Sequence, residues 1–76
     1  MTLSELQQMR ENGLFHHATY RDFGTVWEGL WIYARDLNDF RGYKAAGCFA
    51  KDSPDLHAAE AIARGSGISV GAYGQG

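Results

Sequence analysis

The chain has 76 residues, a formal net charge of −2 and a hydrophobic share of 45%, which predicts one small folded domain over residues 1–76 and argues against wholesale disorder. The seven Lys and Arg side chains form no cluster, which argues against direct nucleic-acid binding, because neutralising phosphates needs a concentrated basic surface. One cysteine excludes an intrachain disulfide, and no stretch approaches the roughly 20 apolar residues of a membrane span. The polar start MTLSELQQMRE is atypical of a signal peptide. We therefore expect a cytoplasmic protein without membrane contact.

The first predicted element is a helix over residues 2–12. Thr2 and Glu5 have the spacing of a capping box, in which each side chain satisfies a backbone N–H at the helix start. The Asn-Gly pair at 12–13 is a typical helix stop. Between these signals an apolar residue recurs every three positions, as on one face of a helix: Leu3, Leu6 and Met9.

The stretch TVWEGLWIYARDLND, residues 25–39, carries two apolar patterns at once. Its apolar residues recur every three or four positions, as in a helix, and also every two positions, as in a strand. Gly29 would cost a helix interior about 1 kcal/mol relative to Ala. Val, Trp, Ile and Tyr, which dominate the first half of the stretch, favour strands. The sequence therefore favours a strand over 26–35, and a helix over 25–37 is the open alternative.

The neighbouring segments supply partners for that strand. Residues 14–22, LFHHATYRD, alternate in polarity as an extended segment does, and a turn is expected at 22–24. Asp-Leu-Asn-Asp at 36–39 has the composition of a hairpin loop that leads into a weaker, Gly- and Ala-rich strand at 41–50. Together these segments predict a three-stranded antiparallel meander.

A second helix and a short final strand complete the predicted fold. Ser53 is a natural N-cap, Pro54 suits the first helical position, and Gly65 can end the helix. The tail ISVGAYGQG alternates as a last strand. The predicted class is α+β: helix, three-stranded antiparallel meander, helix and final strand, with both helices on one face of a four-stranded sheet. The apolar stripe of the second helix consists of Leu56, Ala59, Ile62 and Ala63.

Residues that could carry chemistry are few and poorly grouped. His16 and His17 are adjacent, so on a strand we expect their rings on opposite faces, where they cannot share a metal ion. Cys48 could pair with His57 or His17 as a nucleophile, but no third residue stands out to orient the base. The glycines near the C-terminus follow a helix and precede a strand, the reverse of a phosphate-binding loop. We expect no enzyme, no metal and no cofactor.

The predicted central strand gives the sheet two apolar faces. One face can meet the helices, whereas Trp27, Trp31 and Tyr33 stand on the other, which no predicted element covers. Exposed aromatic side chains supply most of the energy of many protein contacts, and carboxylates beside them can meet a basic partner. The open alternative is that this face is buried within the chain. The predicted partner-binding residues are Trp27, Glu28, Trp31, Tyr33, Asp36 and Asp39.

The hairpin-like segment WEGLWIYARDLNDFRGYKAAGCF and the helix-strand end SPDLHAAEAIARGSGISVGAYG resemble small phage-encoded anti-CRISPR proteins, the inhibitors of type I CRISPR systems. The resemblance is one of size, mild acidity and element order, and it carries over no individual residue. It implies a host nucleoprotein partner, the RNA-guided surveillance complex, whose target-DNA binding or nuclease recruitment would be blocked in the host cytoplasm. The alternative function is a small structural or regulatory subunit, acting as a homodimer or adaptor; monomer and homodimer both stay open.

Overall fold

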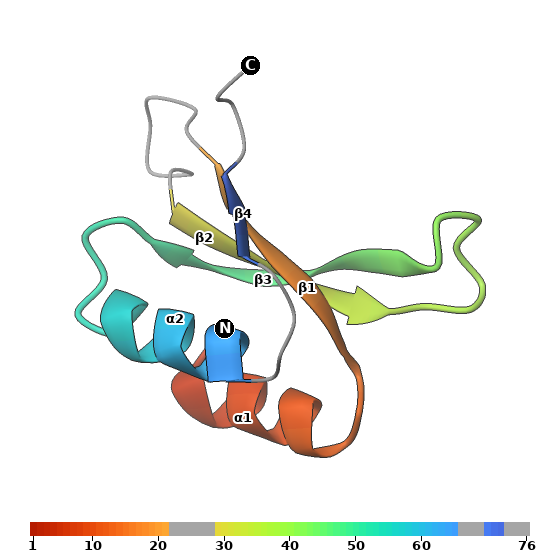
Figure 1. The fold of residues 1–76 in the computed structure, drawn as a ribbon, viewed down its shortest axis with the longest axis horizontal. Helices are drawn as coiled ribbons and strands as arrows, with labels where there is room; N and C mark the ends of the chain where they lie inside the picture. Colours follow the sequence, from red (N-terminus) through yellow and green to blue (C-terminus); the bar gives the residue numbers. More distant parts are fainter. Residues whose placement is uncertain (22–28, 66–69, 73–76) are drawn as a thin grey trace.

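A computed structural model describes residues 1–21, 29–65 and 70–72 of the chain. It has two helices and a three-stranded antiparallel sheet (Figure 1), which confirms the predicted α+β class. The predicted turn at 22–24 lies outside the described residues, as do Trp27 and Glu28. Neither helix of the described part has the length and apolar run needed to cross a bilayer. The elements are α1 (Leu3–Glu11), β1 (Phe15–Arg21), β2 (Gly29–Arg35), β3 (Tyr43–Ala50), α2 (Leu56–Gly65) and β4 (Val70–Ala72).

Helix α1 begins and ends at the signals found in the sequence. The Thr2 hydroxyl accepts the Glu5 N–H at 3.1 Å, and the Glu5 carboxylate accepts the Thr2 N–H at 2.8 Å, so the predicted capping box is confirmed. At the other end the Leu14 N–H donates to the Met9 carbonyl at 2.9 Å, and Gly13 adopts a φ of +72°. This left-handed glycine turns the chain directly from α1 into β1.

The ambiguous stretch is a strand where the structure describes it, at Gly29–Arg35. β2 is the centre of the antiparallel sheet, with β1 on one side and β3 on the other. Gly29 has a φ of +153°, and a Cβ added there would collide with the carbonyl oxygen of Phe49 on β3. The glycine that argued against a helix is therefore required by close strand packing. At the free side of β1, the backbone of β4 runs parallel to it, so the strand order is β3-β2-β1-β4.

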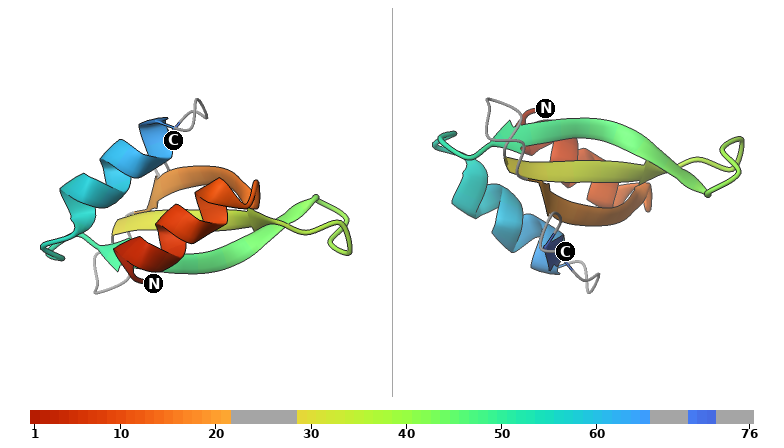
Figure 2. Two further views of the ribbon diagram at one scale, coloured as in Figure 1. Left: turned by 90° about the horizontal axis from the view of Figure 1, so that it is seen from below. Right: turned by 90° about the horizontal axis from the view of Figure 1, so that it is seen from above.

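Both helices lie on the same face of the sheet, as expected (Figure 2). Leu30 and Ile32 of β2 point into this interface and are fully buried. Small residues on α2 let it pack closely, since Ala59 and Ala63 have no exposed surface. The core between the helices and the sheet consists of Leu6, Met9, Phe15, Ala18, Leu30, Ile32, Phe49, Ala59 and Ala63.

Helix α2 begins two residues later than the sequence suggested. Pro54 lies in a turn, and the first helical residue is Leu56. The Ser53 hydroxyl still accepts a backbone N–H of this turn, that of Asp55 at 3.2 Å, and the Ser53 carbonyl accepts the Leu56 N–H. The predicted cap therefore operates through a preliminary turn and not through Pro54 at the first helical position.

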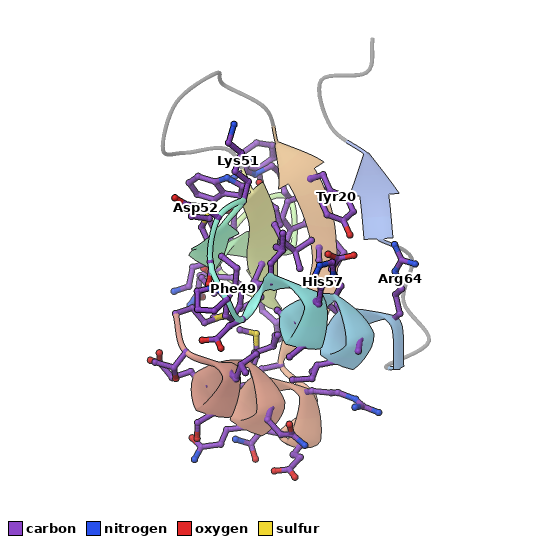
Figure 3. The ribbon with its side chains drawn as sticks, turned by 90° about the vertical axis from the view of Figure 1, so that its left-hand side faces the viewer. Tyr20, Phe49, Lys51, Asp52, His57 and Arg64 are labelled. Atoms are coloured by element: carbon purple, nitrogen blue, oxygen red, sulfur yellow. The ribbon has the colours of Figure 1, made fainter. Side chains whose placement is uncertain are left out.

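The two helices and the sheet are also joined by polar side chains. The Arg10 guanidinium of α1 donates to the carbonyl of Gly65, the last residue of α2, at 2.9 Å. A cation at a helix C-terminus is favourable because it meets unsatisfied carbonyl groups. Tyr20 of β1 lies beside Arg64 (Figure 3), and burial together with a hydrogen bond to Glu60 raises the pKa of its hydroxyl.

Candidate interaction surface

The end of the β2–β3 hairpin projects beyond the helical layer as an arm (Figures 1 and 2). We call residues 33–44 the hairpin arm: the end of β2, a loop at 36–42 and the start of β3. The antiparallel ladder continues to the pair Arg35 and Tyr43, so regular pairing reaches the base of the loop. The arm is therefore a continuation of the sheet, with the stiffness that strand pairing gives it.

The loop at the end of the arm is closed by backbone hydrogen bonds and by two aspartates. The Asp36 N–H donates to the Gly42 carbonyl at 2.9 Å, and the Gly42 N–H donates to the Asp39 carbonyl at 2.7 Å. The Asp36 carboxylate accepts the Asn38 N–H at 2.9 Å. The Asp39 carboxylate accepts the Arg41 N–H at the same distance. Hydrogen bonds from a backbone N–H to an Asp carboxylate two residues earlier hold a loop in one conformation. The φ of +79° at Gly42 is a left-handed conformation that favours glycine.

The charges around the loop are paired with one another. The Arg41 guanidinium donates to both oxygens of Asp39, at 3.3 and 3.2 Å. The Lys44 ammonium lies 3.6 Å from the Asp36 carboxylate. The hydrogen bonds from Arg41 hold the pKa of Asp39 below its usual value, and the same contact raises the pKa of Arg41. Ion pairs at the surface add little stability. They do mean that the carboxylates of Asp36 and Asp39 each have a cationic partner within the loop.

Two large apolar side chains stand almost fully in solvent on this fixed loop. Leu37 is 96% exposed and Phe40 is 97% exposed; we call these two residues the apolar tip. Among the described residues the other exposed large apolar side chain is Leu14, at 48%. The Arg41 guanidinium carbon lies 5.6 Å from the centre of the Phe40 ring, which orients that ring without covering it. The sequence held a signal for the tip, because these two apolar residues interrupt a polar loop.

A cluster of four rings braces the base of the arm on the face away from the helices. His17 stacks on Tyr33 with ring centres 4.5 Å apart, and Tyr43 meets both rings edge-on. Tyr33 is only 5% exposed as a result. His16 contacts Tyr43 as well, at 4.8 Å between ring centres. The rings fix the direction in which the arm leaves the sheet.

The prediction that His16 and His17 point to opposite faces is wrong. Their Nδ1 atoms lie 2.8 Å apart, so one ring donates a hydrogen bond to the other. The reason is a β-bulge: Phe15 pairs with Ala34 and His17 pairs with Tyr33, which leaves His16 as an extra residue. A bulge breaks the strict alternation of a strand and lets two neighbours share one side. Within the described residues, no group of three or more His, Cys, Asp or Glu side chains could hold a metal ion.

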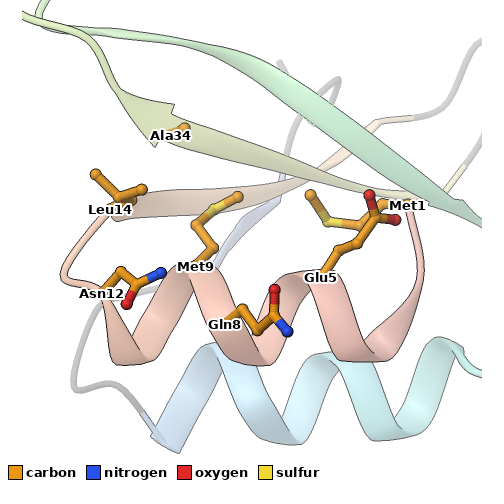
Figure 4. Close-up of a pocket in the computed structure, with 7 residues that line it drawn as sticks. All are labelled: Met1, Glu5, Gln8, Met9, Asn12, Leu14 and Ala34. Carbon is orange, nitrogen blue, oxygen red and sulfur yellow. The ribbon is translucent and has the colours of Figure 1, made fainter.

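A groove runs between α1 and the base of the arm (Figure 4). It is a shallow hollow of about 330 Å³ that is open to solvent, and its apolar part is formed by Met1, Met9, Leu14 and Ala34. The side chain of Met9 points from α1 towards β2 (Figure 4), and the side chain of Met1 lies against Gly47 of β3. Polar residues of α1 form the rim, so the groove has an apolar interior and a hydrophilic edge. We call it the helix groove; its rim residues are Glu5, Gln8 and Asn12.

The structure separates the described members of the predicted partner-binding set. Trp31 is half-buried and Tyr33 is buried, so much of the aromatic surface is packed within the sheet's outer face. Asp36 and Asp39 lie in the loop of the arm, where they close turns. The part of the set that reaches solvent at the arm is therefore its loop, and a role of these residues in binding stays a prediction.

Neither of the two histidines named as a possible base lies within reach of Cys48. Cys48 pairs with Trp31 on the outer face of the sheet, whereas His57 is an exposed residue of α2 on the helix side. His17 shares the outer face with Cys48 but belongs to β1, two strands away, roughly 10 Å at normal strand spacing. Burial raises the pKa of the Cys48 thiol, which lowers its share of reactive thiolate.

Comparisons of the chain with protein-family models, with curated proteins and with solved structures gave no match.

Proposed function

We propose that this protein is a non-catalytic protein-binding domain that contacts its partner with the apolar tip of the hairpin arm. The observation that carries the proposal is the near-complete exposure of Leu37 and Phe40 on a loop whose backbone is held by side-chain turns. Large apolar side chains that add nothing to the core are a cost to solubility unless they are covered in a complex.

The energetics of the tip suit a protein contact. Burying Leu37 and Phe40 in a partner would contribute roughly 1.5–3 kcal/mol for each side chain. A loop that is already ordered loses little conformational entropy on binding, so more of this energy is available as affinity. The paired charges of Asp39 and Arg41 at its rim fit the polar edge of a protein interface.

The same tip suits nucleic acid and membranes less well. The charges of Asp36 and Asp39 are matched by Lys44 and Arg41, so the loop offers no excess of positive charge to attract phosphate groups or an anionic lipid surface. An apolar tip with a charge-neutral rim therefore favours a protein partner that offers an apolar pocket.

The narrower proposal is an inhibitor of a type I CRISPR surveillance complex, which would block target-DNA binding or nuclease recruitment. Its support is the resemblance in size, acidity and element order described above, together with an arm that can enter a partner surface. The alternative is a structural or regulatory subunit that acts as a homodimer or adaptor, and it uses the same apolar tip.

The direct test is a pull-down of the purified protein with purified type I surveillance complexes of several subtypes, with and without target DNA. The double variant Leu37→Ser/Phe40→Ser removes the tip, and Asn38→Asp is the matched control, because it changes an exposed residue of the same loop and keeps both apolar side chains. We expect wild type and Asn38→Asp to bind and the double variant to lose binding. Equal binding by all three would refute the tip as the contact, and no binding to any subtype would refute the inhibitor.

A further inference from the structure

We propose that His16 and His17 form a pH-sensitive switch at the base of the hairpin arm, which opens when both imidazole rings are protonated. The closed state is the one in the structure, where the two Nδ1 atoms lie 2.8 Å apart. Opening turns the His16 ring away from Tyr43 and loosens the arm. The pair therefore controls, through pH, how rigidly the apolar tip is held.

The short contact between the two rings depends on how many protons the pair carries. A neutral imidazole has one N–H donor and one bare nitrogen, so the contact requires an Nδ1–H on one ring and a bare Nδ1 on the other. A first added proton binds the Nε2 of the donor ring, which is bare in that tautomer. The hydrogen bond stays in place and becomes charge-assisted, which strengthens it. The switch therefore stays closed when one proton binds.

A second proton has only the acceptor Nδ1 left to bind. It takes the lone pair of that nitrogen, so two N–H groups then face each other where one hydrogen bond stood. Both rings are now cations, and their centres lie 5.0 Å apart in the closed state. Like charges at this distance repel each other, so the rings must separate once both are protonated.

The surroundings of the pair oppose a charge on one ring and favour it on the other. The His16 ring lies 4.8 Å from the centre of the Tyr43 ring, and the Arg41 guanidinium carbon lies 5.3 Å from the same centre. A protonated His16 is therefore a second cation at a ring that already has one. His17 stacks on Tyr33 at 4.5 Å, where an imidazolium gains a cation–π attraction. Among the described residues, the titratable and charged side chains around the pair are Tyr33, Arg35, Asp39, Arg41 and Tyr43.

His16 is the ring that moves, because it is the bulged residue of β1. Phe15 and His17 keep their places in the ladder opposite Ala34 and Tyr33, and His16 is the extra residue between them. Its side chain can turn towards solvent without breaking a pair of the ladder. His17 is held both by its register and by its stack on Tyr33, so it stays in place.

The ring of Tyr43 transmits the opening to the arm. Tyr43 begins β3 and pairs with Arg35, the last residue of β2, directly below the loop. Its ring contacts His16, His17 and Tyr33. Departure of His16 removes one of these contacts at the point where the arm leaves the sheet (Figure 1). We therefore expect the loop at 36–42 to become more mobile when the switch opens.

The first experiment tests the closed state by heteronuclear NMR of the imidazole nitrogens at about pH 8, where imidazole is neutral. We expect opposite tautomers in the two rings, Nδ1–H in one and Nε2–H in the other. A nitrogen–nitrogen coupling across the hydrogen bond should join His16 to His17. Two Nε2–H tautomers would leave no donor between the Nδ1 atoms and would overturn the inference.

The second experiment follows the rings from about pH 8 to about pH 4, which spans the usual protonation range of imidazole. We expect the nuclear Overhauser effects between His16 and Tyr43 to be lost in acid, while those between His17 and Tyr33 persist. Far-ultraviolet circular dichroism checks that the chain stays folded. A contact between His16 and Tyr43 that survives with both rings protonated would show that the second charge does not open the switch.

The third experiment measures backbone order parameters of residues 36–42 over the same pH series in wild type, His16→Asn and His57→Asn. His57 is an exposed residue of α2, so its variant removes a histidine and leaves the pair intact. We expect wild type and His57→Asn to fall in acid below the value of about 0.85 that marks rigid backbone. His16→Asn cannot be protonated at this position and should keep its order. All three proteins contain Asp36 and Asp39, so an equal fall in all three would assign the loosening to these carboxylates and refute the switch.

Discussion

Removing the apolar tip should leave the fold almost unchanged, because the tip lies outside the core. In the double variant Leu37→Ser/Phe40→Ser, the two side chains lose only the 4% and 3% of their surface that is buried in the free chain. Taking roughly 150–200 Å² for each and about 25 cal/mol per Å², the lost hydrophobic stabilisation is about 0.3 kcal/mol. Loss of the Arg41 contact with the Phe40 ring adds about 0.5–1 kcal/mol at an exposed site. We therefore expect the free energy of unfolding to fall by about 1 kcal/mol.

The assay is urea denaturation followed by far-ultraviolet circular dichroism, at a protein concentration low enough to keep the chain monomeric. Leu30→Ala is the internal standard, because Leu30 is fully buried and such a truncation costs about 2–5 kcal/mol. A double variant as unstable as Leu30→Ala would refute the reasoning, since it would show that the tip supports the fold and needs no partner to explain it.

Further outcomes follow from the loop and from the glycine in β2. Gly42→Ala should cost about 1–2 kcal/mol of unfolding free energy, because its φ of +79° disfavours a side chain while nothing lies within 4 Å of the added Cβ; a stability equal to wild type would contradict this. Gly29→Ala should cost about 3 kcal/mol or more in the same denaturation assay, because the new Cβ meets the Phe49 carbonyl and the strands must part. Asp39 has a pKa below its usual value, so its contribution to stability is present above the unfolded-state pKa and lost as pH falls through the folded one. In carboxyl NMR titrations Arg41→Gln should raise the Asp39 pKa towards 3.8, and an unchanged titration would show that Arg41 is not the cause.

The helix signals and the hairpin were predictable because they depend on neighbouring residues. The capping box of Thr2 and Glu5 and the turn at Gly13 act within one helical turn, so their spacing in the sequence is sufficient evidence. Residues 29–35 were predicted as a strand partly because Gly29 is unfavourable in a helix. The structure explains why glycine is present: a Cβ at this position would collide with the Phe49 carbonyl of β3.

The bulge at His16 could not be predicted, because it depends on how two strands pair. It leaves His16 as an extra residue opposite β2. Nothing in the residue types around His16 marks it as the bulged position, so simple alternation placed the two imidazoles on the wrong sides. The sequence contains a signal for the apolar tip, because Leu37 and Phe40 interrupt a polar loop. The predicted site was instead centred on aromatic residues of β2, and Trp31 and Tyr33 are largely packed in the sheet.

The hydrogen bond from Arg10 to the Gly65 carbonyl has a consequence for how the chain can be made. It joins residues 55 positions apart, and the core likewise needs both α1 and α2. During synthesis, α1 and the hairpin emerge first with one side of their apolar surface still uncovered. The domain can close only once Gly65 has left the ribosome, so translation must pass at least residue 65 before a stable fold exists. Contacts of such long sequence separation slow folding, and until they form, the growing chain depends on dilution or on a chaperone to avoid aggregation.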